Sequence, residues 1–238
     1  MTLEWQAAWQ AVVHHPLFCF GITLGAYQLA MWAYQKTRWM FVQPVLLATA
    51  LVICVLLLAD IRFPEYIRDV HLLSVFLGPT TVALAVPLFM NLRRIRQMFW
   101  PIVITLVLGG VVATLSGIGL AWAFGIEHSM LMSLAPKSAT SPIAMLVAEE
   151  IGGIASLAAV FVLVAGVLGA MFGVEVMRRF GIVHPVAMGF SLGIVSHAVG
   201  TSRALQEGEE CGAFAALGMS LMGVSVALFL PLAMALFI

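Results

Sequence analysis

The chain has 238 residues, of which 63% are hydrophobic and only 9% are charged, and its formal net charge is zero. Soluble domains carry about 25% charged residues, so this composition excludes a soluble globular protein and indicates an integral membrane protein. The balanced charge also argues against a nucleic-acid partner. The charges are spaced too evenly to leave room for a sizeable soluble domain, so we expect a single integral membrane domain over residues 1–238.

Six apolar runs are long enough to cross a bilayer as helices, which takes about 20 residues each. They cover residues 16–35, 41–59, 70–91, 100–124, 153–176 and 212–237, and shorter or interrupted runs cover 129–148 and 185–204. No α/β or all-β alternation is present, so the predicted fold is all-α, a polytopic transmembrane helical bundle with discontinuous or re-entrant helices. Interrupted segments in both halves are typical of inverted-repeat transporters, although the two halves do not align by eye.

Arginine clusters predict the orientation, because short cytoplasmic loops are enriched in basic residues. One cluster follows the third run and another follows the run 153–176: Arg93, Arg94 and Arg96, then Arg178 and Arg179. If the run 129–148 crossed fully, these two clusters would lie on opposite faces. If it turns between Pro136 and Pro142 and leaves by the face it entered, they share the inner face, so we favour a re-entrant segment.

The third run is interrupted by Gly78-Pro79-Thr80-Thr81. One interpretation is a simple proline kink, which is common in membrane helices. The other is a discontinuous helix whose N-terminus points at an anion. In that case Thr80 and Thr81 would supply hydroxyl groups to a binding site.

The segment Pro136-Lys137-Ser138-Ala139-Thr140-Ser141-Pro142 is the most polar stretch at membrane depth. Its prolines remove backbone donors and disfavour helix before them, so we expect a helix break. A lysine beside several hydroxyls and exposed amides can bind a small carboxylate. We therefore name Lys137, Ser138, Thr140 and Ser141 as candidate ligands. The alternative is a lysine that extends from a short hairpin to the interface.

A second polar cluster is Ser196-His197-Ala198-Val199-Gly200-Thr201-Ser202-Arg203. On a continuous helix Ser196, Gly200 and Arg203 would share one face, with His197 and Thr201 on the next. Gly200 would let a ligand or another backbone approach, and His197 changes protonation near neutral pH, which suits proton coupling. Alternatively, His197 is a buried histidine satisfied by a neighbour. Arg203 either faces a ligand or pairs with a glutamate among residues 207–210.

The other titratable residues have simple structural explanations. Glu149 is a second proton-coupling candidate, or else it lies at the solvated end of a hairpin. Glu175 is expected to pair with Arg178 or Arg179. The chain has no G-x-S-x-G elbow, so we expect no hydrolase and no other enzyme activity. The six histidines and three cysteines never recur at ligand spacing, so no metal or other cofactor is expected.

Two of these motifs resemble the LrgB family, which includes CidB and the C-terminal half of the plastidal glycolate/glycerate translocator. The family pattern P-K-S-V-T-T-P-I-A-M is matched by residues 136–145, with Ser141 in place of the second threonine. The pattern S-H-A-[IL]-G-T-[AS]-R is matched by residues 196–203. Ile151-Gly152-Gly153 and the stretch 77–88 also match, so the similarity extends from about residue 70 to the C-terminus.

The resemblance implies two functions. The plastid relative implies transport of short 2-hydroxy acids, and bacterial members carry the description of an antiholin-like regulator of murein hydrolase activity and lysis, with a small LrgA-like partner. The polar clusters favour transport, so we expect a carrier of glycolate, glycerate, pyruvate or lactate coupled to protons. The expected location is the bacterial inner membrane, in contact with the lipid bilayer, and the expected assembly is a homodimer.

Overall fold

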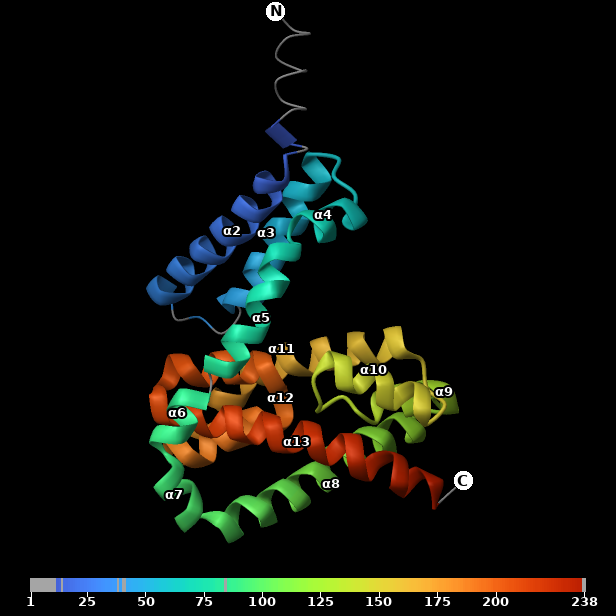
Figure 1. Ribbon diagram of the computed structural model, residues 1–238. Coiled ribbons are helices and arrows are strands. Elements are labelled where there is room, and N and C mark those ends of the chain that lie inside the picture. Colours follow the sequence, from blue (N-terminus) through green and yellow to red (C-terminus); the bar gives the residue numbers. More distant parts are fainter. Residues whose placement is uncertain (1–11, 14, 38, 40–41, 84, 237–238) are drawn as a thin grey trace, which may run out of the picture. The chain divides into compact units, whose positions relative to one another are not determined.

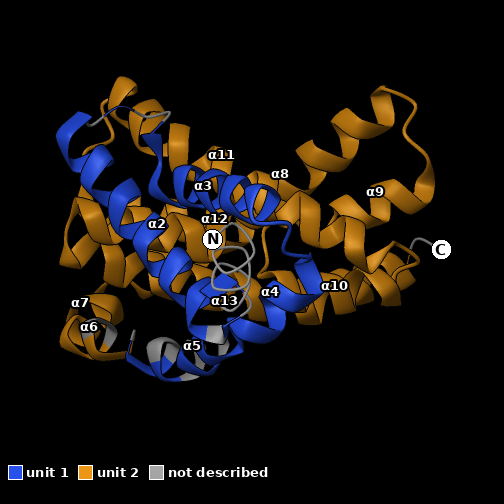
Figure 2. Cartoon of the chain, turned by 90° about the horizontal axis from the view of Figure 1, so that it is seen from above, with its two compact units in different colours: residues 1–83 blue, residues 84–238 orange. Residues whose placement is uncertain are grey.

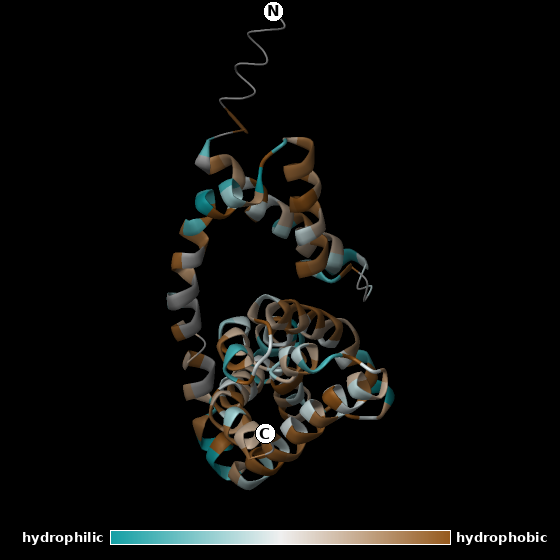
Figure 3. Cartoon of the chain, turned by 90° about the vertical axis from the view of Figure 1, so that its right-hand side faces the viewer, coloured by the Kyte–Doolittle hydropathy of each residue, from teal (hydrophilic) through white to brown (hydrophobic). Residues whose placement is uncertain are grey.

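The computed structural model describes residues 12–13, 15–37, 39, 42–83 and 85–236, which form helices joined by short connections (Figure 1). Strands are absent from these described ranges, so the predicted all-α fold is confirmed. Much of the helical chain consists of apolar residues (Figure 3), and many of the large ones are exposed. Four described helices are long and apolar enough to span a membrane: α2 (Pro16–Thr37), α8 (Phe99–Ala123), α11 (Ala155–Arg179) and α13 (Glu209–Ala235). The chain is a multi-pass membrane protein.

The chain divides into two compact units, residues 1–83 and 84–238 (Figure 2). In the first unit α2 packs beside α3 (Pro44–Leu58), followed by α4 (Phe63–Asp69) and α5 (His71–Ala83). The pair α3 and α4 is bent by 117° and counts as at most one further span. Helix α5 continues through Pro79, which excludes a discontinuous helix at that proline. Thr80 and Thr81 belong to α5, and their side chains lie outside the described residues.

The second unit begins with two short helices, α6 (Ala85–Met90) and α7 (Leu92–Gln97), and then the long α8. Two interrupted segments alternate with the long helices that follow. The first consists of α9 (His128–Leu134) and α10 (Ser141–Glu150), and the second is α12 (Pro185–Glu207). The order in this unit is therefore span, interrupted segment, span, interrupted segment, span.

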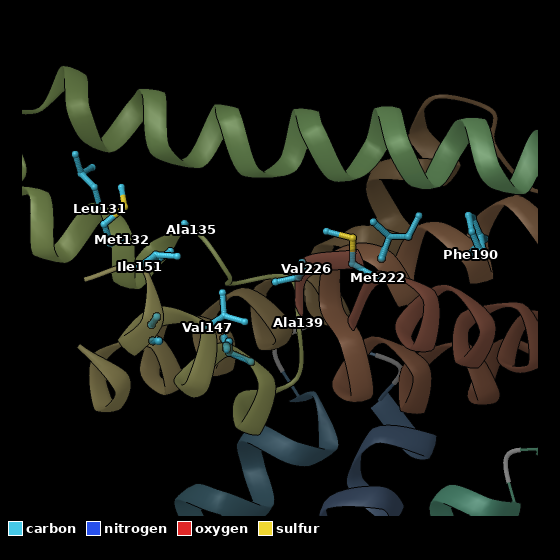
Figure 4. Close-up of a cluster of buried hydrophobic side chains, with 14 of the residues drawn as sticks. Leu131, Met132, Ala135, Ala139, Val147, Ile151, Phe190, Met222 and Val226 are labelled. Atoms are coloured by element: carbon cyan, nitrogen blue, oxygen red, sulfur yellow. The ribbon is translucent and has the colours of Figure 1, made fainter. Parts of the chain in front are cut away.

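The first interrupted segment folds back on itself. Residues 135–140 are not helical, as the prolines predicted, and α10 then begins with Pro142 in its first turn. The backbone amide of Ile154 donates to Ser133 Oγ at 2.7 Å, so the end of the segment returns to α9. Figure 4 shows Met132, Ala135 and Ile151 side by side. A straight helix would hold residues 133 and 154 about 30 Å apart, so residues 128–150 form a re-entrant hairpin, the first hairpin.

Helix α12 also reverses direction, at His197, where φ is 40° and ψ is −129°. A Cβ on Gly200 would clash with the carbonyl oxygen of Leu192, eight residues earlier, which a continuous helix would place about 12 Å away. Residues 185–196 and 198–207 are therefore the two arms of a second hairpin. The first arm runs parallel to α13, because Gly189 and Gly193 lie against the backbone of Cys211 and Ala215. These two glycines, four residues apart, permit close packing of the two backbones.

The two hairpins enter from opposite ends of the unit. The first hairpin ends where α11 begins, and the second starts just after α11 ends. Since α11 has 25 residues, the two hairpin bases are separated by about 37 Å along its axis.

The arginine clusters lie together at the base of the second hairpin. Arg94 pairs with Glu210, and Arg178 pairs with Glu207 at 2.5 Å, so both clusters contact the turn between α12 and α13. The two clusters therefore lie at the same end of the second unit, and their common position on the inner face of the membrane stays a prediction. We call this end of the second unit, which carries Arg93, Arg94, Arg96, Arg178 and Arg179, the arginine end.

Candidate functional site

Lys137 lies at the tip of the first hairpin, where it is half-buried. Its ammonium donates to the carbonyl oxygen of Ala113 in α8 at 2.6 Å. The side chain lies over Gly117, where an added Cβ would come within 2.9 Å of the lysine Cε. Within the described residues Lys137 forms no salt bridge, so a neutral carbonyl is its partner. A cation at membrane depth without a carboxylate is unfavourable by at least about 2.5 kcal/mol, so this position favours an incoming anion.

The hydroxyl residues of the first tip surround the start of α10. Ser138 is buried, while Thr140 and Ser141 are half-buried. Thr140 is the N-cap residue of α10, and its side chain makes no capping hydrogen bond. The N-terminus of a helix carries unpaired amides and partial positive charge. Together these groups offer donors of the kind that bind carboxylates.

His197 forms the tip of the second hairpin and is 5% exposed. Its positive φ lies in a region that favours glycine, so the residue is held there by its surroundings. Nε2 lies 2.9 Å from the carbonyl oxygen of Val162 in α11. Because a carbonyl only accepts, Nε2 carries a proton and Nδ1 is the atom that can gain one. The carbonyl of His197 accepts from Thr201 Oγ1 at 2.9 Å, four residues along the returning arm.

Small residues of α11 make room for this tip. A Cβ on Gly166 would come within 2.5 Å of the His197 ring, and one on Gly169 would overlap Ser196 Oγ. The Ser196 hydroxyl is completely buried and has no hydrogen-bond partner in the part of the chain that the structure describes. Gly200 does let a backbone approach, but that backbone is the first arm of the same hairpin. Ser196 and Gly200 touch across the turn and not along one helix face.

The two hairpin tips reach the same depth in the unit. On α8, Lys137 contacts Ala113, and Ile194, which precedes the second tip, lies 4.0 Å from the Cβ position of Gly109. These two contacts are one helical turn apart, or about 6 Å along the axis. On α13, Thr201 contacts Met219 from the second hairpin, and Ile143 from the first contacts the Cβ position of Gly223. Two interrupted segments far apart in sequence therefore meet in the middle of the unit.

The key side chains of the two tips nevertheless point at different helices. Lys137 reaches α8, whereas His197 and Ser196 face α11. No hydrogen bond or ion pair joins Lys137 to His197 among the described residues. The structure thus brings the two predicted clusters to neighbouring positions without a direct contact between their charged groups.

Arg203 takes the second of the two alternatives raised by the sequence, pairing with a nearby glutamate. It is 5% exposed and contacts Glu207 at 2.5 Å and Glu175 at 3.8 Å. The predicted pair between Glu175 and Arg178 is also present, at 3.8 Å. Sequence reasoning missed that these pairs form one network across α11 and α12. The signal was available as two acids and two arginines near the ends of consecutive helices.

Glu149 is exposed near the end of α10, far from the hairpin tip in sequence. This placement agrees with the solvated end of a hairpin. A cavity of about 480 Å³ lies between α8 and α13, with a lining that is apolar apart from Thr114 and Ser225. It offers no cation, so it does not suit a carboxylate. No group of residues able to hold a metal ion occurs in the described ranges.

Comparison with known proteins identifies the family. The sequence matches the LrgB-like family over residues 23–236. The chain belongs to this family. The uncharacterized protein YxaC of Bacillus subtilis strain 168 is 34% identical over 91% of this chain and 94% of its own length. An uncharacterized protein of Haemophilus influenzae is 32% identical over 88% of this chain and 91% of its own length.

A third LrgB-like relative, from Bacillus cereus strain B4264, carries the name antiholin-like protein LrgB. It is 28% identical over 92% of this chain and 96% of its own length. No solved structure matches the chain. The LrgB-like match includes both hairpins, so the two tips are part of the region that relates the chain to this family.

Proposed function

We propose that the protein is a carrier of small monocarboxylates, such as glycolate, glycerate, pyruvate or lactate. The observation that carries the proposal is Lys137, a cation at the tip of a re-entrant hairpin with a carbonyl but no carboxylate as its partner. A substrate carboxylate would supply the missing charge. The uncapped amides at the start of α10, where Thr140 is the N-cap residue, and the hydroxyls of Ser138 and Ser141 would add hydrogen-bond donors.

The arrangement of the hairpins supports a carrier. The two hairpins enter the unit from opposite ends. Their tips reach a similar depth along α8. In transporters with interrupted helices, substrates bind where such segments meet near the bilayer midplane. Because Arg203 already has two acidic partners, the proposal assigns it no role in holding the carboxylate.

His197 is the proposed site of proton coupling. Its ring lies at the second tip, and Nδ1 can accept a proton while Nε2 remains bonded to the Val162 carbonyl. Protonation there would place a second positive charge near the substrate. A carrier forms no covalent intermediate, so no enzyme activity is proposed. We propose the bacterial inner membrane as the location and a homodimer as the assembly.

A second candidate is an antiholin-like regulator of murein hydrolase activity that acts with an LrgA-like membrane protein. It is favoured by the name of the Bacillus cereus relative, which aligns over 92% of this chain. Such a regulator does not require a cation at a hairpin tip. The two candidates therefore differ in what they expect of Lys137.

The test is uptake of labelled glycolate and pyruvate into proteoliposomes that contain the purified protein, with and without an inward proton gradient. We expect saturable uptake that is lost in Lys137→Met and partly kept in Lys137→Arg. Lys36→Met, which removes a lysine of α2, is the matched control and should transport normally. In His197→Gln we expect uptake that no longer responds to the gradient.

Unchanged uptake in Lys137→Met would refute the assigned site. Absence of uptake for every monocarboxylate tested, together with release of a trapped dye, would refute the carrier and favour the lysis regulator.

A further inference from the structure

The returning arm of the second hairpin, residues 198–207, is bounded by two abrupt changes of backbone direction. His197 precedes it with a φ of 40°, and Gly208 follows it with a φ of 150°. Helical residues between these positions keep their internal hydrogen bonds however the two flanking residues rotate. The arm is therefore a short rigid helix between two hinge positions.

The outer half of this arm is fastened to α11 by four charged side chains. Glu207 accepts a hydrogen bond from Arg178 and forms an ion pair with Arg203, each at 2.5 Å. Glu175 lies 3.8 Å from each of the same two arginines. Acids and bases thus alternate around a closed ring of four contacts. We call these four residues the latch.

The latch combines buried and exposed groups. The side chains of Arg203 and Glu207 on the arm are 6% and 14% exposed, whereas those of Arg178 and Glu175 on α11 are 51% and 35% exposed. Arg203 and Glu207 pair with each other within the arm, and their other two contacts are with Glu175 and Arg178 of α11. Removing one partner of such a pair leaves an uncompensated charge, which weakens the closed arrangement.

A cavity of about 320 Å³ adjoins the latch at the arginine end. It is lined by Arg178, Val183, Pro185, Met188, Glu207 and Cys211. Two latch residues therefore border open space and have room to separate without moving a packed core. This space lies at the base of the second hairpin, on the path from the arginine end toward the tip.

The tip that precedes the arm is incompletely satisfied. Ser196 keeps a buried hydroxyl without a partner in the described residues, and His197 keeps a strained backbone. Both conditions disfavour the closed hairpin, and the latch opposes them. The arm thus has a strained backbone at one end and ion pairs that can separate at the other. These features allow a closed and an open arrangement, which a gate requires.

We propose that residues 198–207 are a gate at the arginine end and that the four latch residues hold it closed. The gate would uncover the second tip, including Thr201, when the latch opens. This rests on the proposed carrier function for its purpose, because alternating access requires a closure on each side of the site. Whether the latch controls access to the arm can be tested without a substrate.

The experiment measures modification of a single cysteine by a membrane-impermeant maleimide in nanodiscs, where both faces are accessible. Thr201→Cys is introduced into a variant whose three native cysteines are serine. Thr201 is 3% exposed and lies in the arm, so the closed gate should protect it. We expect Glu207→Gln to accelerate its modification roughly tenfold to a hundredfold, the factor expected for losing a charge-assisted hydrogen bond.

Two controls separate gate opening from general loosening. Glu209→Gln changes an exposed glutamate two residues away, which makes no salt bridge within the described ranges, and it should leave the rate unchanged. Ala144→Cys reports on the first hairpin, where this residue is completely buried, and it should stay protected in Glu207→Gln. If Glu207→Gln does not fold, Glu175→Gln removes the longer, more exposed contacts and should give a smaller acceleration.

Combining Arg178→Gln with Glu207→Gln tests whether the two residues act through one contact. We expect the double variant to be modified no faster than the faster single variant, because each change already breaks the same pair. Equal rates in Glu207→Gln and the parent would overturn the proposal, and so would faster modification of both Thr201→Cys and Ala144→Cys. Failure of uptake by the parent protein would overturn the carrier function and leave the result on the latch intact.

Discussion

The backbone of His197 makes an unusual prediction about substitution. At most helical positions glycine is less stable than alanine by about 1 kcal/mol. At His197, φ of 40° and ψ of −129° favour glycine instead. A non-glycine residue in such a region is strained by about 1–3 kcal/mol. We therefore expect His197→Gly to be more stable than His197→Ala.

The size of the effect follows from what the two variants share. Both lose the ring and its hydrogen bond to Val162, a contact worth about 1 kcal/mol. Both leave nearly the same cavity beside Gly166. Their difference therefore isolates the backbone, and we expect the glycine variant to be more stable by about 1–2 kcal/mol. At about 2–4 °C per kcal/mol for a chain of this size, Tm should differ by roughly 2–8 °C.

The assay is thermal unfolding of the purified protein in one detergent at one protein concentration. Ala198→Gly is the matched control, because Ala198 follows the break and lies in the helical arm. It should lower Tm, the opposite sign to the change from alanine to glycine at 197. If His197→Ala is as stable as His197→Gly or more stable, residue 197 is helical. In that case α12 is a continuous helix and the second hairpin does not exist.

Three further experiments test the two hairpins and the arginine end. Gly200→Ala should destabilise the protein by about 1–3 kcal/mol in thermal unfolding, because its Cβ would clash with the first arm, whereas Gly119→Ala meets nothing within 4 Å and should be neutral or stabilising. Ser133→Ala should lower stability by about 1 kcal/mol, because it removes the hydrogen bond between the Ser133 hydroxyl and the Ile154 amide that closes the first hairpin. In a cysteine-free variant, Gln97→Cys and Gly181→Cys should be modified by an impermeant maleimide from the same face, and modification from opposite faces would refute the shared arginine end.

The first hairpin could be predicted from sequence because its cause is local. Pro136 and Pro142 remove backbone donors within one short stretch, and the distribution of arginines then required an even number of crossings. Both inferences depend on residue type alone. The position of Lys137 at the tip followed from them. Its partner did not, because nothing in the sequence indicates that the Ala113 carbonyl of α8 lies beside it.

The second hairpin could not be placed in the same way. No proline or glycine stands at residue 197, so a continuous helix was the natural expectation for the motif around it. The reversal depends on tertiary contacts instead: Gly166 and Gly169 of α11 admit the tip, and Gly200 admits the opposite arm. The predicted shared helix face of Ser196 and Gly200 was therefore wrong. Arg203 was ambiguous for a related reason, because its second acidic partner comes from a different helix.

The two hairpins differ in what holds them closed, and this difference bears on how a carrier would work. Within the described residues the first hairpin is held by hydrogen bonds without an ion pair: Ser133 accepts from the Ile154 amide, and the Lys137 ammonium donates to a carbonyl of α8. The second is closed by the charged latch that includes Arg203 and Glu207. A site covered from each end by one hairpin becomes accessible from one side when one hairpin opens while the other stays closed. A pore would need both to open together. The two hairpins are held closed by different kinds of contact, so conditions that open one need not open the other. This difference supports alternating access over a channel.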